Sequence, residues 1–213
     1  MRDTDYGYLK ITYKKGTKSN NIGRWYCNKG IGIQPLCVSV RHTICDGLWV
    51  DIDQVNSHPT ILKNFIDKFK LKSPLLDECM NNREAFLAEV MEEESCNRST
   101  AKTLVISTIN GKRYKSHTLV KLANELKPII QHIIDLDEYK EIKDFVIETY
   151  KDGKNIAGKT ISRILQVIEN DLLETYVEFF IDRGLITIYN DAKLNEVGYE
   201  VATIRIQFIC RIL

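Results

Sequence analysis

The sequence predicts an α+β fold in which an antiparallel sheet is built from both ends of the chain, with a helical region inserted between them. Residues 7–50 have the character of strands, and two further strand-like runs close the chain. The intervening residues show helical spacing of apolar side chains. The predicted domains are therefore a sheet made of residues 1–60 and 185–213, and a helical region of residues 61–184.

The N-terminal strands come first. Tyr8–Tyr13 alternates between apolar and polar residues, as a half-buried strand does. Gly and Asn residues cluster at 15–23 and around Gly30 and Gly32, and such clusters mark turns.

From Pro59 to Glu94 the pattern of apolar residues is helical, with a break expected near Ser73–Pro74. In residues 81–94 the charged side chains lie opposite apolar residues at helical spacing, namely Phe86, Leu87, Val90 and Met91. The later elements are two helices within 117–150 that separate around 135–137, a long helix at Ile161–Asp182, and strands at Leu185–Tyr189 and Val201–Phe208.

Composition excludes several classes of protein. With 44% hydrophobic and 28% charged residues, the chain is expected to fold rather than stay disordered. The six cysteines include no C-x-x-C pair, which argues against a structural zinc site and a disulfide scaffold. No signal peptide or membrane-length apolar run occurs, so an intracellular, non-secreted protein with no membrane partner is expected.

Positive charge gathers near the N-terminus. Residues 1–41 contain eight Lys or Arg residues against Asp3 and Asp5, with Tyr and Trp side chains between them. Basic groups bind phosphates and aromatic rings stack on bases, which favours nucleic-acid binding. A solvated edge strand protected by lysines explains the same pattern equally well.

Asp51 and Asp53 end an apolar run and are spaced i, i+2, so both face one side of a strand. Two adjacent carboxylates repel unless a cation lies between them, and Mg²⁺ (or Mn²⁺) prefers such oxygen ligands. The alternative is an ordinary strand-to-helix turn, with an Asp capping the helix and Pro59 in its first turn.

Arg98 and Lys102 are one helical turn apart, which places both cations on one helix face, where they could hold a triphosphate. A solvated helix face is the alternative. A strand is another, because Thr103–Ile109 is rich in β-branched residues.

Gly153–Thr160 matches the P-loop pattern G-x-x-x-x-G-K-T, which predicts a nucleoside triphosphatase if a buried strand precedes it. The preceding residues have helical spacing instead. The alternative interpretation is a plain helix N-terminus, capped by Asn155 or Thr160.

Several of these segments, in their order along the chain, resemble the motifs of family A DNA polymerases. The matching residues are Gly23–Arg24, Ile33–Pro35, Val40–Arg41, Asp51–His58, Arg98–Lys102 and Asn110–Gly111. The residues of these motifs are most similar to those of the divergent polymerases of large DNA viruses and virus-like transposons. Asn56 and Asn110 depart from the family pattern, which carries Glu and an aromatic residue there.

The resemblance implies a palm-like sheet with a helical fingers-like insertion and a two-metal nucleotidyl transfer. It implies catalytic and metal-binding roles for Asp51, Asp53 and Asp191, nucleotide contacts from Gln54, Asn56, Arg98, Lys102, Asn110 and Gly111, and nucleic-acid contacts from Arg24, Gln34, Arg41 and His58. The implied partners are primer–template DNA, deoxynucleoside triphosphates and a replicative helicase or primase, in the host cytoplasm, nucleus or viral factory.

Two further expectations concern the end of the chain. Asp191 is the only residue there that matches the family's second metal-binding motif, and a surface turn would also explain it. The apolar run 208–213 predicts an interrupted polymerase that is weakly active or inactive. A catalytically dead remnant that only binds nucleic acid is therefore a third hypothesis, beside the polymerase and the P-loop nucleoside triphosphatase.

Overall fold

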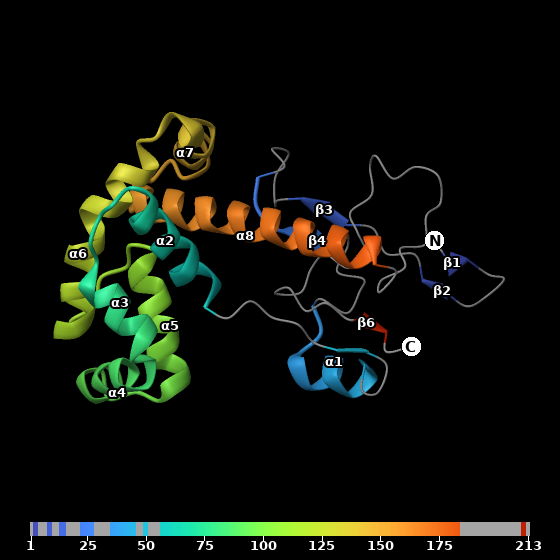
Figure 1. Cartoon of the computed structure of the whole chain (residues 1–213), viewed down its shortest axis with the longest axis horizontal. Helices are drawn as coiled ribbons and strands as arrows, with labels where there is room; N and C mark the ends of the chain where they lie inside the picture. Colours follow the sequence, from blue (N-terminus) through green and yellow to red (C-terminus); the bar gives the residue numbers. More distant parts are fainter. Residues whose placement is uncertain are drawn as a thin grey trace. The chain divides into compact units, whose positions relative to one another are not determined.

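The computed structural model describes residues 2–3, 8–9, 13–15, 22–27, 35–45, 49–50, 56–183 and 210–211 (Figure 1). The strands expected at 185–189 and 201–208 lie outside these residues. The chain divides into two compact units, one made of residues 1–55 and 169–213, the other of residues 56–168. The domain boundaries expected at residues 60 and 184 stay a prediction.

The unit formed by residues 56–168 is helical throughout its length (Figure 1). Its helices are α2 (Ser57–Lys68), α3 (Pro74–Asn81), α4 (Arg83–Glu93), α5 (Arg98–Ile109), α6 (His117–Ile134), α7 (Lys140–Thr149) and the first part of α8 (Ile156–Asp182), with a 3₁₀ turn at Asp137–Tyr139. The predicted break at Ser73–Pro74 is confirmed, because Ser73 precedes α3 and Pro74 begins it. Proline suits this position, since the first N–H groups of a helix have no partner within it.

Leucine and isoleucine side chains form the core of this unit. Those with almost no exposed surface are Leu62, Ile66, Leu76, Leu87, Ile109, Leu119, Leu122, Leu126, Ile133, Ile161 and Ile164. Together with the other buried apolar side chains, they recur three or four residues apart along the helices, so each helix turns an apolar stripe inward. Removing this apolar surface from water is the main source of the unit's stability.

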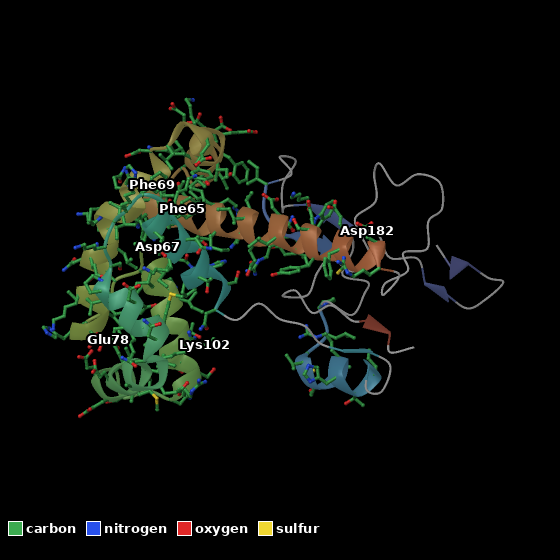
Figure 2. The ribbon with its side chains drawn as sticks, viewed as in Figure 1. Phe65, Asp67, Phe69, Glu78, Lys102 and Asp182 are labelled. Atoms are coloured by element: carbon green, nitrogen blue, oxygen red, sulfur yellow. The ribbon has the colours of Figure 1, made fainter. Side chains whose placement is uncertain are left out.

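Aromatic contacts join α2 and the residue that follows it to α6 and the 3₁₀ turn after α6. Phe65 meets the edge of Tyr139, with 6.0 Å between ring centroids, and Phe69 meets His132 at 4.9 Å (Figure 2). Burial raises the pKa of Tyr139 to about 12, and the neighbouring Glu138 contributes to the shift. The tyrosine therefore remains neutral throughout the physiological pH range.

The other unit contains the described strands and a short helix. The strands are β1 (Arg2–Asp3), β2 (Tyr8–Leu9), β3 (Tyr13–Lys15), β4 (Trp25–Cys27), β5 (Trp49–Val50) and β6 (Cys210–Arg211), and the helix is α1 (Val38–Cys45). The strands pair two by two and antiparallel, as β1–β2, β3–β4 and β5–β6. The C-terminal part of α8 belongs to this unit.

The prediction of a palm-like antiparallel sheet is wrong for the part of the chain that the structure describes. That part is mainly helical, and its strands are only two or three residues long. Val38–Cys45, expected within a β-rich region, is the helix α1. Local β propensity is weak, since strands are stabilised by the neighbours they pair with, and a β-branched segment can equally form a helix.

Candidate functional site

The carboxylates predicted to hold a metal ion, Asp51, Asp53 and Asp191, lie outside the described residues, as do Gln34 and Gln54. Within the described ranges, no group of three His, Cys, Asp or Glu side chains is placed to hold a metal ion. The magnesium or manganese site therefore stays a prediction.

Three other predicted residues lie at helices. Asn56 precedes α2 with a left-handed φ of 53°, and its side chain makes no capping hydrogen bond. His58 lies in the first turn of α2 and is half-buried, and Arg41 is half-buried on α1. Their predicted contacts with nucleotide and nucleic acid are not tested by this geometry.

Helix α5 carries Arg98 and Lys102, and the alternative of a strand for this region is wrong. The Asn97 side chain caps the helix by accepting a hydrogen bond from the Thr100 backbone N–H at 2.9 Å. Ala101, Val105 and Ile109, each four residues apart, are buried on one face. The cap and this stripe outweigh the β-branched composition.

The two cations of α5 differ in their surroundings. Arg98 binds Glu84 of α4 through two hydrogen bonds, Nε to Oε2 at 2.9 Å and Nη2 to Oε1 at 2.5 Å. The hydrogen bond from Arg98 lowers the pKa of the Glu84 carboxyl. Lys102 projects from α5, is exposed, and makes no ion pair with any residue that the structure describes (Figure 2). Arg98 thus has a carboxylate partner at the surface, and the predicted triphosphate contact of the two cations stays a prediction.

Asn110 and Gly111 end α5 and pack directly against the start of α8. Asn155 Nδ2 donates to the Asn110 carbonyl oxygen at 3.2 Å. A Cβ added to Gly158 would lie 2.2 Å from that same oxygen, and one added to Gly111 would lie 2.9 Å from the Gly158 Cα. Gly111 also has a φ of +79°, which glycine adopts readily. The two glycines therefore allow the backbones of α5 and α8 to touch, and we call this the glycine contact.

Gly153–Thr160 forms the N-terminus of α8 but follows the helix α7, and no strand precedes it within residues 56–150. The Thr160 hydroxyl is buried and donates to the Ile156 carbonyl oxygen at 2.9 Å. Lys159 Nζ lies 3.2 Å from Asp152 Oδ1 and 4.1 Å from the centre of the Tyr150 ring. The Gly158 N–H donates to Asn155 Oδ1 at 3.2 Å, as the capping alternative predicted. In this conformation Gly158 and Thr160 make hydrogen bonds at the start of α8, and Lys159 is paired with Asp152.

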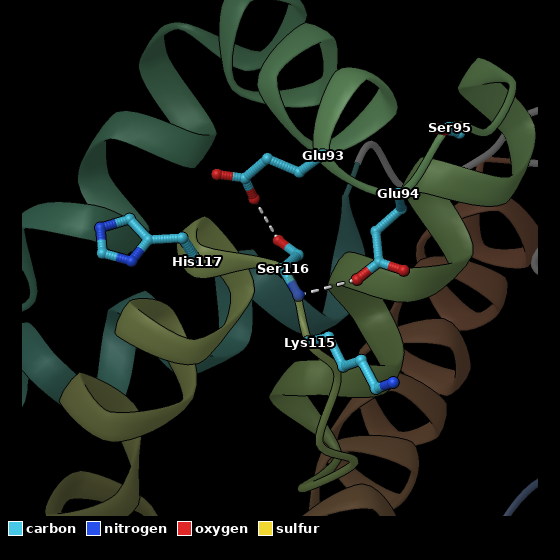
Figure 3. A pocket seen from close by; sticks show the side chains of 6 residues that line it. All are labelled: Glu93, Glu94, Ser95, Lys115, Ser116 and His117. Carbon is cyan, nitrogen blue, oxygen red and sulfur yellow. Dashed lines mark hydrogen bonds between the residues drawn. The ribbon is translucent and has the colours of Figure 1, made fainter.

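A shallow hollow of about 420 Å³ lies where α4 ends and α6 begins (Figure 3). The Ser116 backbone N–H donates to Glu94 Oε1 at 2.9 Å, and the Ser116 hydroxyl donates to Glu93. Burial raises the pKa of Glu93, but hydrogen bonds from Ser116 and Thr118 outweigh this effect and lower it overall. Because these carboxylates satisfy the free N–H groups at the start of α6, the hollow is a structural joint.

A polar cluster fastens the β3–β4 hairpin to the C-terminal part of α8. Glu174 accepts hydrogen bonds from Trp25 Nε1 at 2.9 Å and from Lys15 Nζ at 3.3 Å. Arg24, predicted to contact nucleic acid, donates from Nε to Glu169 Oε2 at 2.9 Å and donates to it also from Nη2. Its guanidinium is thus engaged within the protein.

Two of these features were missed by reasoning from the sequence. Glu169 and Glu174 lie about 150 positions from the basic hairpin they bind, and no local pattern connects the two. The glycine contact is the second, because the sequence places Gly111 and Gly158 each in a nucleotide-binding motif. A pair of glycines near helix ends is a general signal for close backbone approach, and it was available here.

Comparison with known proteins finds a relative among the proteins of viruses. The chain is 28% identical over 196 residues to a protein of Sputnik virophage named "Putative helicase V13". The match covers 87% of this chain and 25% of the virophage protein, so the chain spans about a quarter of its relative's length. No family model matches the chain, and no solved structure matches it.

This match contradicts the resemblance to family A DNA polymerases. The similarity extends over most of the chain, and the relative is named as a helicase and not as a polymerase. The polymerase motifs are short, and several of their residues have other roles here, such as Arg24 and Arg98 in ion pairs.

None of the described helices is long and apolar enough to cross a membrane.

Proposed function

We propose that this chain is a nucleic-acid-binding part of a helicase-like protein that acts inside an infected cell. The observation that carries the proposal is the match to the virophage protein over 87% of the chain. A helicase must hold a nucleic-acid strand and must couple that grip to hydrolysis of a nucleoside triphosphate. The helical unit of residues 56–168 offers exposed cations on a folded scaffold with a buried apolar core, which suits the first of these tasks.

The geometry supports strand binding better than hydrolysis. A P-loop cradles phosphates with backbone N–H groups between a buried strand and a helix, whereas Gly153–Thr160 follows α7. Binding the phosphate backbone of a nucleic acid does not require a P-loop, because cations on the surface of a folded domain are sufficient to attract a polyanion. With a net charge of only +1, the chain should bind through a local surface and not through its overall charge.

Binding can be measured by fluorescence anisotropy with a labelled single DNA strand of about 20 nucleotides, which is longer than the site of a typical small binding domain. We expect micromolar affinity at about 50 mM salt and an affinity lower by roughly tenfold or more at about 200 mM. Binding releases counterions from the DNA, and this release becomes less favourable as the salt concentration rises. A neutral peptide nucleic acid of the same base sequence serves as control and should not bind. Absence of DNA binding at low salt, or equal binding of the neutral strand, would refute the proposal.

A second candidate function is nucleoside triphosphate binding at Gly153–Thr160. Its letters match the P-loop pattern, and the relative's name fits a triphosphatase. A phosphate at the start of α8 would have to replace Asp152 as the partner of Lys159, and Thr160 would have to release the Ile156 carbonyl before it could bind Mg²⁺.

For this second candidate, we expect Lys159→Ala to weaken binding of a fluorescent ATP analogue with Mg²⁺ by tenfold or more, because the ammonium would meet the β- and γ-phosphates. Lys140→Ala is the matched control, since Lys140 is an exposed lysine on α7 paired only with Asp144 among the described residues. Equal affinities of the wild type and Lys159→Ala would exclude phosphate binding at this segment.

A further inference from the structure

The glycine contact brings two basic segments of the chain together. Residues 110–116 contain Lys112, Arg113 and Lys115 and no acidic residue. Residues 150–160 contain three lysines and one acidic residue, Asp152. The segments lie far apart in sequence, yet the hydrogen bond from Asn155 to the Asn110 carbonyl and the close approach of Gly111 to Gly158 hold them in contact.

Three of these cations lie next to the contact and are exposed. Lys112 follows Gly111, Arg113 comes next, and Lys154 precedes Asn155. None of the three forms an ion pair with a residue of the described part of the chain; Arg113 donates only to the neutral Asn124 side chain, at 3.2 Å. We call Lys112, Arg113 and Lys154 the two-loop patch.

Among the other charged residues of the two segments, Asp152 and Lys159 are paired with each other, whereas Lys151 is exposed and makes no ion pair with a described residue. Asp152 accepts hydrogen bonds from the Lys159 ammonium and from the Lys154 backbone N–H, both at 3.2 Å. These two hydrogen bonds lower the pKa of Asp152, the one from Lys159 most. Lys115 lines the hollow beside Glu94 (Figure 3). The paired Asp152 therefore does not neutralise the cations of the two-loop patch.

We propose that the two-loop patch binds the phosphate backbone of a single nucleic-acid strand, with one contact from the α7–α8 loop and two from the α5–α6 loop. The proposal rests on the proposed function, for which it names the binding surface. Charge complementarity is the argument: exposed cations without a counter-charge among the described residues, on two loops held together by backbone packing, match a line of phosphates. The contact fixes the two loop backbones relative to each other, so binding has to order only the side chains and not the loops as well.

The test is a triple variant, Lys112→Ala, Arg113→Ala and Lys154→Ala, in the full chain. We expect its affinity for the labelled single strand to fall at least tenfold at about 100 mM salt, and the slope of log K against log salt to decrease by about 2, since each lost phosphate contact removes about 0.7. The matched control removes three exposed lysines elsewhere in the same unit, Lys70→Ala, Lys72→Ala and Lys127→Ala. It changes the net charge equally and should keep both the affinity and most of the slope.

A second measurement needs no variant. Lysines of the wild-type protein are acetylated with and without saturating DNA, and the extent of modification is read by mass spectrometry. Lys112 and Lys154 should be protected together, while Lys70 and Lys127 should react equally in both samples. If the wild type binds DNA but the triple variant matches the control variant, or if Lys112 and Lys154 stay unprotected, the patch is not the binding surface, although the proposed function stands. If the wild type does not bind DNA, the proposed function itself fails.

Discussion

Replacing Gly158 by alanine should lower the free energy of unfolding by about 2 kcal/mol, within the range measured for overpacked cores. The added Cβ would lie 2.2 Å from the Asn110 carbonyl oxygen, which is a backbone atom, and 2.5 Å from Asn155 Oδ1. Alanine favours a helix over glycine by up to about 1 kcal/mol, so the steric cost must exceed this gain. Urea unfolding followed by circular dichroism of the helices measures the difference.

Gly153→Asn is the matched control for this substitution. Gly153 has a φ of +65° but no atom within 4 Å of an added Cβ, and asparagine tolerates the left-handed conformation better than most residues. We expect a change below about 0.5 kcal/mol, which is typical of a surface site. Unchanged stability in Gly158→Ala, combined with lost nucleotide binding, would show instead that Gly158 serves a phosphate site.

Replacing Glu174 by alanine should release the β3–β4 hairpin from α8. The substitution removes the shared acceptor of Trp25 Nε1, Lys15 Nζ and Asn170 Nδ2, the last at 2.6 Å. Asn170 is only 3% exposed, so its amide would lose a partner away from water. Hydrogen bonds to a charged group contribute about 1.5–3 kcal/mol each when buried; since Glu174 is partly exposed, we expect a total loss of about 2–3 kcal/mol.

The hairpin can be followed by the fluorescence of Trp25 in a Trp49→Phe background, where we expect a red shift of the emission in Glu174→Ala as water reaches the indole. Asp171→Ala is the matched control. Asp171 lies 3.8 Å from Lys15 Nζ and is 60% exposed, so its removal should leave the emission unchanged. An unshifted spectrum in Glu174→Ala would show that the hairpin is held by other contacts.

The same cluster predicts a dependence on pH. Burial raises the pKa of Glu174, but hydrogen bonds from Trp25 and Asn170 and the charge of Lys15 outweigh this effect, so the pKa is lowered overall from 4.5. A carboxyl with a lowered folded-state pKa stabilises the folded form above its unfolded-state pKa, and this stabilisation is lost as the pH falls through the folded-state value. The red shift of Trp25 should therefore appear in the wild type below about pH 4, and a Glu174→Gln variant should lack this transition.

The sequence alone determined the helices of residues 56–168 well. Helical spacing predicted the pattern from Pro59 to Glu94, the break at Ser73–Pro74 and the separation near residues 135–137, and the structure confirms each of these. These features depend on signals within a few residues, namely caps, proline and an apolar stripe. Such signals determine where a helix begins and ends without contributions from distant parts of the chain.

The candidate site could be predicted only in part. Several cations were identified as candidates for phosphate binding, but the tertiary structure decided which of them have partners. Arg24 and Arg98 are paired with Glu169 and Glu84, whereas Lys102 makes no ion pair among the described residues. The sequence shows the same residue type whether or not the cation has an acidic partner in the fold, so no local pattern distinguishes paired from unpaired cations.

The glycine contact is the clearest case of what only the tertiary structure decided. From the sequence alone, Gly158 completes a P-loop pattern, and Gly111 follows Asn110 in a segment that resembles a polymerase motif. In the structure they lie against each other, 47 positions apart in sequence, because α5 and α8 meet backbone to backbone there. Sequence patterns report the conformations that a residue favours locally, while the role of a glycine depends on which distant atom occupies the space that a side chain would need.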